Sequence, residues 1–196
     1  MSDIPVQATA TEQWRNLVKE AIDYNGVNLD EELESYLVFL LMRYMKETTL
    51  TSKVMALEYI RGLQSPGPQR NECMRDVGDQ CLLFSGLYPE VAERRQVRIS
   101  YYVKMGRSAY ASLSGFTQSA IANMYSHLAE SFVSLMDTLQ AMRCMNDSSM
   151  QLQPLMAYEL WQDTRSQQAR RVLLPHEQYN HTPCIGSVVD EKPIKH

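Results

Sequence analysis

The chain has 196 residues, of which 44% are hydrophobic and 21% charged, and its formal net charge at pH 7 is −4. This length and composition suit one large domain with an ordinary hydrophobic core, and they exclude a disordered chain and a small disulfide scaffold. The acidic balance argues against general nucleic-acid binding, because the neutralisation of phosphates requires a basic face.

The N-terminal residues 1–8 are expected to form a loose arm, and they lack the basic and apolar segments of a secretory signal. The longest purely apolar run, Tyr36 to Met42, is far shorter than the roughly 20 residues that span a bilayer. We therefore expect a soluble cytoplasmic protein that does not bind membranes. No CxxC pair occurs among the cysteines, which are interpreted as reduced apolar residues: Cys73, Cys81, Cys144 and Cys184.

The first helix is predicted to begin after Thr9, which forms a capping box with Glu12. Apolar residues then recur at helical spacing over residues 14–22. Gly26 predicts the end of this helix, because glycine accepts the positive φ of a C-cap at little cost.

A second capping box, Asn28 with Glu31, predicts the start of the next helix. Residues 33–45 are apolar almost all round that helix, which indicates a central position in the fold. Either Thr51 or Ser52 supplies the N-cap of a third predicted helix. The Ser-Pro-Gly-Pro segment at 65–68 ends it.

The middle of the chain predicts two helices that meet at a turn and organise the fold. The first covers residues 69–85 and carries Gly78 in its apolar stripe. The second begins with Ser100 as its cap and carries Gly106 in its apolar stripe. Because glycine has no side chain, Gly78 and Gly106 are interpreted as positions of close helix packing.

One long helix is predicted over residues 117–146. Its seam packs either inside the bundle of its own chain or across a dimer axis, and burial in the chain's own core is favoured. Methionines beside the seam widen it, as core residues do. The seam residues recur at alternating spacings of four and three: Ile121, Tyr125, Leu128, Phe132, Leu135, Leu139 and Met142.

A last helix is predicted from Pro154 to Arg171, and from residue 172 the helical pattern fails among prolines and a glycine. We predict an all-α fold, a single-domain bundle of six to eight helices over residues 1–171 with an irregular C-terminal tail over 172–196. No strand run occurs before residue 172, and no repeat of 20–50 residues is present.

Signatures of common enzyme classes are absent from the sequence, including the phosphate loop, GxGxxG, HExxH, GxSxG and the ExxH pair of di-iron bundles. His176, His181 and Cys184 are metal-ligand types, but they are interpreted as part of an ordinary polar tail. His127 is interpreted as an ordinary helical histidine, since no nucleophile is placed near it. We predict no metal site and no cofactor.

The densest mix of charged and aromatic residues lies on the two middle helices. If these helices pack antiparallel at their glycines, Asp79 would meet Arg107 or a tyrosine hydroxyl. Arginines and tyrosines could hold a small anion or a phosphorylated ligand. The same residues could instead form an internal network that fixes the helix pair, or a partner surface. The candidate ligand-binding residues are Arg75, Asp79, Tyr101, Tyr102, Arg107 and Tyr110.

Several short sequence motifs follow each other in this region: Asp79, then Ser85-Gly86-Leu87-Tyr88-Pro89, then Tyr101-Tyr102, Met105-Gly106 and Tyr110. The stretch resembles an uncharacterised family of bacterial helical proteins with the approximate text D…L…SG[FL][FY]PE and YY…MG…AY. The resemblance covers this stretch and not the whole chain. It implies a bacterial origin and a helical fold, and it implies no activity. Arg107 stands where similar sequences often have a second glycine.

Two functions remain open at this point. The first hypothesis is a non-enzymatic interaction or regulatory module that acts as a homodimer or binds a partner protein. It rests on the missing catalytic signatures, the heptad seam and the methionine-rich helices. The alternative is a small-ligand-binding or catalytic helical protein, with a polar site formed by Asp79, Tyr101, Tyr102, Arg107 and Tyr110.

Overall fold

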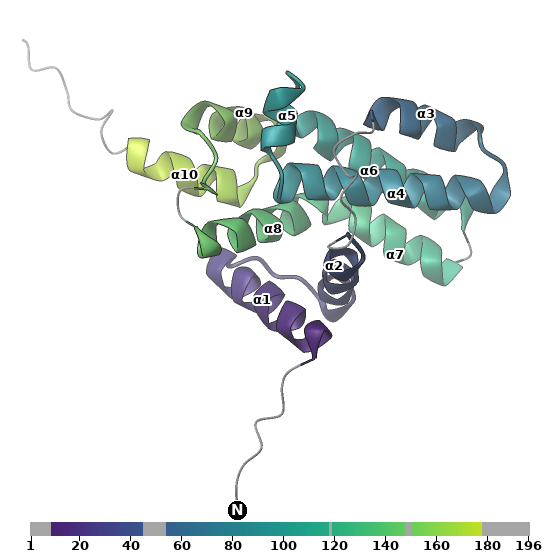
Figure 1. Cartoon of the computed structure of the whole chain (residues 1–196), viewed down its shortest axis with the longest axis horizontal. Coiled ribbons are helices and arrows are strands. Elements are labelled where there is room, and N and C mark those ends of the chain that lie inside the picture. The colour runs from purple at the N-terminus through teal and green to yellow at the C-terminus, as the bar shows by residue number, and fades with distance from the viewer. Residues whose placement is uncertain (1–8, 45–53, 118, 148–149, 178–196) are drawn as a thin grey trace, which may run out of the picture.

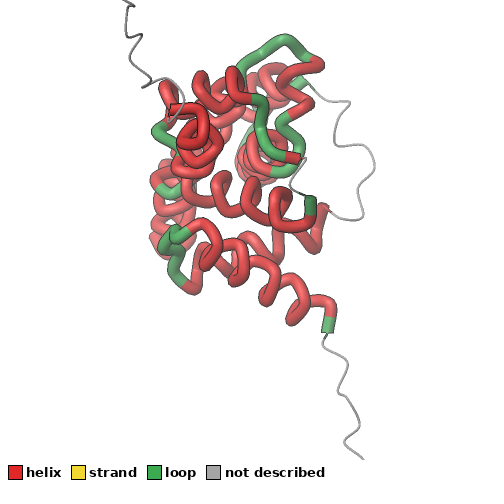
Figure 2. Tube along the Cα trace, turned by 90° about the vertical axis from the view of Figure 1, so that its left-hand side faces the viewer, coloured by secondary structure: helices red, strands yellow, loops and turns green. Residues whose placement is uncertain are grey.

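The computed structural model describes residues 9–44, 54–117, 119–147 and 150–177. These residues form helices joined by loops, with no strand among them (Figures 1 and 2). The helices in these ranges are α1 (Ala10–Asn25), α2 (Glu31–Tyr44), α3 (Met55–Gln64), α4 (Gly67–Gly86), α5 (Glu90–Arg94), α6 (Ile99–Phe116), α7 (Ser119–Glu130), α8 (Phe132–Asn146), α9 (Pro154–Thr164) and α10 (Gln167–Glu177). The predicted all-α class is confirmed.

The predicted number of helices, six to eight, is wrong, because two predicted helices are each divided. The long helix breaks at Ser131, where φ is −87° and ψ is 7°. This break lets α7 pack on α6 while α8 packs against α1 and α4. The last helix breaks at Arg165, which adopts the left-handed conformation with φ 61°.

Helix α10 continues to Glu177, so the predicted start of an irregular tail at residue 172 falls inside a helix. The apolar Val172 and Leu173 are partly buried against the core, which explains why the helix persists there. The rest of the predicted tail, residues 178–196, lies outside the described residues.

The predicted ends of α1 are confirmed. The Glu12 amide donates to Thr9 Oγ1 at 3.3 Å, the Thr9 amide donates to Glu12 Oε2 at 2.8 Å, and Gly26 forms the C-cap with φ 60°. The predicted cap of α2 is wrong, because Asp30 accepts the Leu33 amide at 2.9 Å in place of Asn28.

Helix α3 begins at Met55 and has no side-chain cap at Val54, while the predicted cap residues 51–52 lie outside the described residues. Helix α6 begins one residue before Ser100, and the Ser100 hydroxyl donates to Asp163 Oδ2 at 2.6 Å instead of capping the helix.

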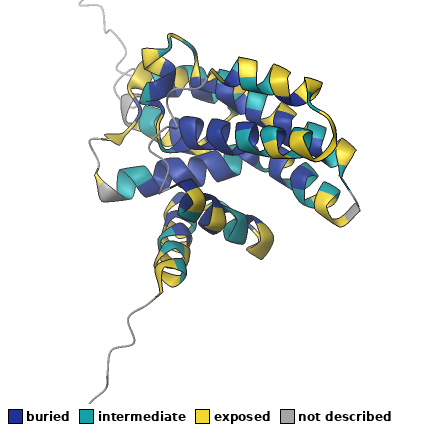
Figure 3. Cartoon of the chain, turned by 45° about the vertical axis from the view of Figure 1, so that its right-hand side comes forward, coloured by how far each residue is buried: buried dark blue, intermediate teal, exposed yellow. Residues whose placement is uncertain are grey.

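Helix α4 is central, with α3, α6 and α8 packed around it, and much of its C-terminal half is buried (Figure 3). Helices α4 and α6 run antiparallel, because Gly78 faces Tyr110 while Phe84, later on α4, faces Tyr102, earlier on α6. A Cβ on Gly78 would overlap the Tyr110 ring, and one on Gly106 would overlap the Phe132 ring. Both glycines therefore lie at points of close helix contact.

The predicted heptad seam lies in the core of its own chain, as favoured. Its residues from Tyr125 to Met142 are all buried, whereas Ile121 at the start is 52% exposed. Met136 beside the seam is also buried. These buried side chains cannot form the contact surface of a dimer while the fold is intact.

Among the described residues, no helix combines the length and the apolar character that crossing a membrane requires.

Candidate functional site

The carboxylate of Asp79 is buried in the middle of α4 and is the centre of a polar cluster. Asp79 Oδ1 accepts hydrogen bonds from the Tyr36 hydroxyl at 2.5 Å and from the Tyr110 hydroxyl at 2.8 Å. Arg43 Nη1 lies 3.3 Å from Asp79 Oδ2, while Arg43 Nη2 donates to Asp76 Oδ1 at 2.6 Å. The cluster thus joins α2, α4 and α6.

The local sequence explains how these side chains reach Asp79. Tyr36 and Arg43 stand seven residues apart on α2, about two turns, so both project from one face. The Tyr110 ring packs closely against the bare backbone of Gly78, which brings its hydroxyl beside the next residue of α4, Asp79. A larger residue at 78 would remove this contact.

Burial raises the pKa of the Asp79 carboxyl from its ordinary value of 3.8 to about 6, and the hydroxyls of Tyr36 and Tyr110 and the charges of Arg43 and Arg75 oppose this rise. The pKa of Tyr36 and that of Tyr110 are both raised well above the ordinary value, first by burial and then by the Asp79 charge. Both tyrosines are therefore hydrogen-bond donors at neutral pH and not bases.

A cavity of about 210 Å³ adjoins this cluster between α2 and α4. Arg75 Nε is buried and has no hydrogen-bond partner among the described residues, and Arg75 Nη2 is 3.8 Å from Asp76 Oδ1. A buried donor without an acceptor is costly, by roughly 1–3 kcal/mol. The cavity is lined by Tyr36, Phe39, Leu40, Arg43, Arg75 and Asp79.

The structure brings together three of the six predicted site residues, Arg75, Asp79 and Tyr110. Arg107 does not reach Asp79, because its Nε donates to the Ala129 carbonyl at 3.1 Å and ties α6 to α7. Of the two alternatives for Asp79, the tyrosine hydroxyl is observed and Arg107 is not.

Tyr101 and Tyr102 lie near the start of α6, away from Asp79. The Tyr102 ring is buried against Phe84, with 5.4 Å between the ring centroids, and Tyr101 packs beside it. Both tyrosines line a separate hollow of about 410 Å³ with Met55 at the start of α3. They belong to a different part of the surface from the Asp79 cluster.

Sequence reasoning missed Tyr36 and Arg43, which contribute two of the three polar contacts to the Asp79 carboxylate described above. Arg43 is the only basic residue of the otherwise apolar and acidic helix α2. A lone cation on a helix buried on several sides needs a carboxylate partner, and this signal could have found Arg43. Tyr36 has no comparable signal, because its position fits the apolar stripe equally well.

A second buried carboxylate, Asp137 on α8, holds the start of α10. Asp137 Oδ1 accepts from Ser166 Oγ at 2.5 Å and Oδ2 accepts from the Gln167 amide at 2.8 Å. The Ser166 hydroxyl also accepts the Ala169 amide at 3.0 Å, as an N-cap does. Burial raises the pKa of Asp137 to about 6. This cluster fixes a helix end.

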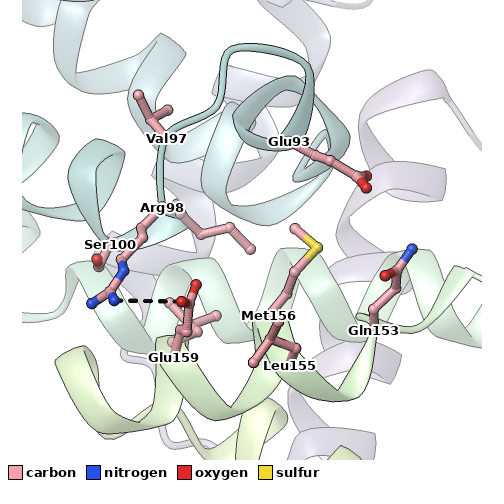
Figure 4. A pocket seen from close by; sticks show the side chains of 10 residues that line it. Glu93, Val97, Arg98, Ser100, Gln153, Leu155, Met156 and Glu159 are labelled. Carbon is pink, nitrogen blue, oxygen red and sulfur yellow. Dashed lines mark ion pairs between the residues drawn. The ribbon is translucent and has the colours of Figure 1, made fainter.

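A hollow of about 190 Å³ lies between the turn from α5 to α6 and helix α9 (Figure 4). On one side Arg98 is 3.4 Å from Glu159, and on the other side lie Glu93 and Gln153, with Met156 between the two sides (Figure 4). Arg98 is also 3.5 Å from Asp163. Because its cation is paired with two surface carboxylates, this hollow makes a weaker case for a ligand site than the Asp79 cavity.

A further groove of about 290 Å³ is more apolar and lies where α1, α2 and α8 meet. Its one cation, Arg143, is 3.4 Å from Glu90. The lining residues are Trp14, Leu17, Leu41, Leu87, Met142, Arg143, Asp147 and Met150.

Of the other residues considered in the sequence, His127 has ordinary surroundings. His127 Nδ1 lies 3.4 Å from Asp30 Oδ2 and 3.7 Å from Glu32 Oε2, at the acidic start of α2. No group of three metal-ligating side chains is present among the described residues. His181 and Cys184 lie outside those residues, as does the side chain of His176.

No family model matches the chain, and neither the curated proteins nor the solved structures include a match to it. The resemblance based on Asp79, residues 85–89 and Tyr110 therefore stays a prediction.

Proposed function

We propose that this chain is a small-molecule-binding helical protein whose site is the cavity beside Asp79. One observation carries the proposal: two residues that line one cavity are Asp79, with a buried carboxylate, and Arg75, with a buried nitrogen that has no partner among the residues described. Convergent polar groups on a partly apolar wall are characteristic of ligand sites.

Binding accounts for the cavity better than catalysis does. Its lining includes no serine, cysteine or histidine that could act as a nucleophile. Tyr36 is held as a neutral donor, and Asp79 already receives three donors. These residues recognise a ligand by hydrogen bonds and charge, and the site needs no covalent step.

The proposal is tested by thermal unfolding of the purified protein with a panel of small carboxylates, phosphates, amines and neutral amides. A ligand present at about 100 times its dissociation constant stabilises the fold by about 2.7 kcal/mol. The compounds that raise the melting temperature therefore identify the chemical class of the ligand. The cavity variant is Arg75→Gln, and the matched control is Asp137→Asn, which alters the other buried carboxylate.

The expected result is a shift in the wild type and in Asp137→Asn that disappears in Arg75→Gln. Arg75 suits this test because its side chain is 37% exposed and its ion contact is long, so its replacement costs little stability. No shift with any class, or the same shift in Arg75→Gln, contradicts the proposal.

The homodimer hypothesis keeps one support, an exposed apolar row on α3. Leu57, Ile60 and Leu63 are 60%, 49% and 44% exposed and follow each other at a spacing of three residues. Native mass spectrometry at several concentrations tests it. A dimer that Leu57→Lys dissociates supports self-association through α3, and a strict monomer without a partner counts against it.

A further inference from the structure

We infer that the ligand of the Asp79 cavity is a small monocarboxylate with an apolar body, and that it binds together with one proton, which Asp79 takes up. The inference rests on the proposed function of the cavity and adds the class of ligand and the regulation of binding by pH.

The N–H donors that the two lining arginines leave unused point to an anion. A guanidinium carries five N–H bonds, and Arg43 uses one toward Asp79 and one toward Asp76. Arg75 contributes a buried Nε–H with no acceptor among the described residues. A carboxylate can accept two parallel N–H bonds from one guanidinium, so it supplies the acceptors that these two arginines lack.

The other side of the cavity is apolar. Leu40 is almost fully buried, whereas Phe39 is 64% exposed although it belongs to a helix that is otherwise largely covered. An apolar body on the ligand would cover Phe39 and remove its ring from water. The small volume, about 210 Å³, favours a ligand with a single ring or a short chain.

The charges around Asp79 limit the ligand to one negative charge. Arg43 and Arg75 provide two cations, and Asp76 and Asp79 provide two anions, so the cluster is neutral as it stands. A further carboxylate would leave one surplus negative charge beside Asp79, and two neighbouring carboxylates disfavour the ionised form of both. The other titratable groups near Asp79 are phenols: Tyr36 and Tyr44 on α2, Tyr110 on α6 and Tyr125 on α7.

Asp79 is the group that takes up the proton. Burial raises its pKa to about 6, close enough to neutrality for a proton to be taken up, whereas the phenols of Tyr36 and Tyr110 are already protonated. Oδ1 is occupied by two hydroxyls, so the proton adds to Oδ2. A protonated Oδ2 releases Arg43 Nη1, which then faces the ligand.

Isothermal titration calorimetry with benzoate tests the inference, with benzamide as the uncharged counterpart. Titrations at about pH 5.5 and about pH 7.5, each in two buffers of different ionisation enthalpy, count the protons taken up. The affinity for benzoate is expected to fall by about tenfold per pH unit above about pH 6, with close to one proton taken up per ligand near pH 7. Asp79→Asn, which resembles the protonated residue, is expected to bind benzoate without this pH dependence.

The outcomes separate the inference from the proposed function. Benzoate binding that is equal at both pH values, or that takes up no proton, overturns the inference and leaves the binding function intact. Binding of an amine or a phosphate from the panel without any binding of benzoate also overturns it. If no compound of the panel binds the wild type, both the inference and the proposed function fail.

Discussion

The two buried carboxylates, Asp79 and Asp137, are alike in burial and differ in their surroundings. Each is 2–3% exposed, and burial raises the pKa of each to about 6. Asp137 receives its donors from a single turn, the start of α10, and its two oxygens complete a helix cap. Asp79 receives donors from α2 and α6, and it forms part of a cavity wall.

The difference teaches that a raised pKa alone does not mark a functional carboxylate. Burial produces the shift in both places, whatever the group does. What separates the two is the neighbouring cavity and its lining residue Arg75, whose buried Nε has no hydrogen-bond partner in the part of the chain that the structure describes. We therefore assign the binding role to Asp79 and a structural role to Asp137.

The largest expected effect is on the pH dependence of stability, and it should be similar at the two carboxylates. Because both pKa values rise from 3.8 to about 6 on folding, the folded state binds more protons between about pH 4 and pH 6. The free energy of unfolding therefore falls as the pH rises through this window, by about 3 kcal/mol per group at most. Urea unfolding of the wild type, Asp79→Asn and Asp137→Asn at both ends of the window measures it.

The free energy of unfolding of each asparagine variant should increase relative to that of the wild type as the pH rises, because asparagine does not ionise. Curves that run parallel to the wild type would mean that the replaced carboxyl does not titrate in this window on folding.

The next largest effect is the loss of stability when Gly78 is replaced, because this change disturbs the Asp79 cluster. In Gly78→Ala the new methyl group displaces the Tyr110 ring and with it the bond to Asp79, at a cost of about 2–3 kcal/mol. Gly115→Ala is the matched control on α6, because nothing lies within 4 Å of its Cβ, and alanine there should be neutral or slightly stabilising. Chemical denaturation measures the stability of both variants. Equal stabilities of Gly78→Ala and Gly115→Ala would contradict the close packing at Gly78.

Removal of the Asp137 carboxylate should act on a helix end and not on ligand binding. Asp137→Ala leaves the Ser166 hydroxyl and the Gln167 amide without their acceptor, which costs about 2 kcal/mol. Hydrogen exchange should quicken at the first turn of α10, while the ligand panel gives the same pattern as the wild type. If Asp137→Ala remains folded but no longer responds to the ligand, the assignment of different roles to the two carboxylates is contradicted.

The smallest effect concerns one hydroxyl. Tyr110→Phe keeps the ring against Gly78 and removes one of the two hydroxyl donors to Asp79 Oδ1, at a cost of about 1 kcal/mol near neutral pH. The cost should shrink below about pH 5, because the protonated carboxyl needs the donor less. Unfolding at both pH values measures the difference, and a cost that does not change with pH would show that the hydroxyl does not stabilise the ionised form.

The sequence predicted the helical class and the close-packed glycine positions, because periodicity and the absence of a side chain are local properties. It did not predict the break at Ser131, since the apolar spacing continues from Leu128 to Phe132 without interruption. It placed Asp79 near a tyrosine but chose Arg107 in place of Arg43. Arg107 lies on a helix close to Asp79 in the sequence, and the prediction favoured it for that reason. In the folded chain Arg43 on α2, 36 residues before Asp79, contacts the carboxylate instead. Which helix covers a buried charge is decided by the assembly of the core, which local patterns do not contain.

The central claim is that Arg75 and Asp79 bind a ligand, and nuclear magnetic resonance of the arginine side chains tests it most directly. Arg107 is the internal reference, because its Nε–H is already bonded to the Ala129 carbonyl. On addition of the compound that raises the melting temperature, the Arg75 Nε–H resonance should shift and exchange more slowly, while that of Arg107 stays in place. An Arg75 resonance that does not move at saturating ligand would contradict the claim.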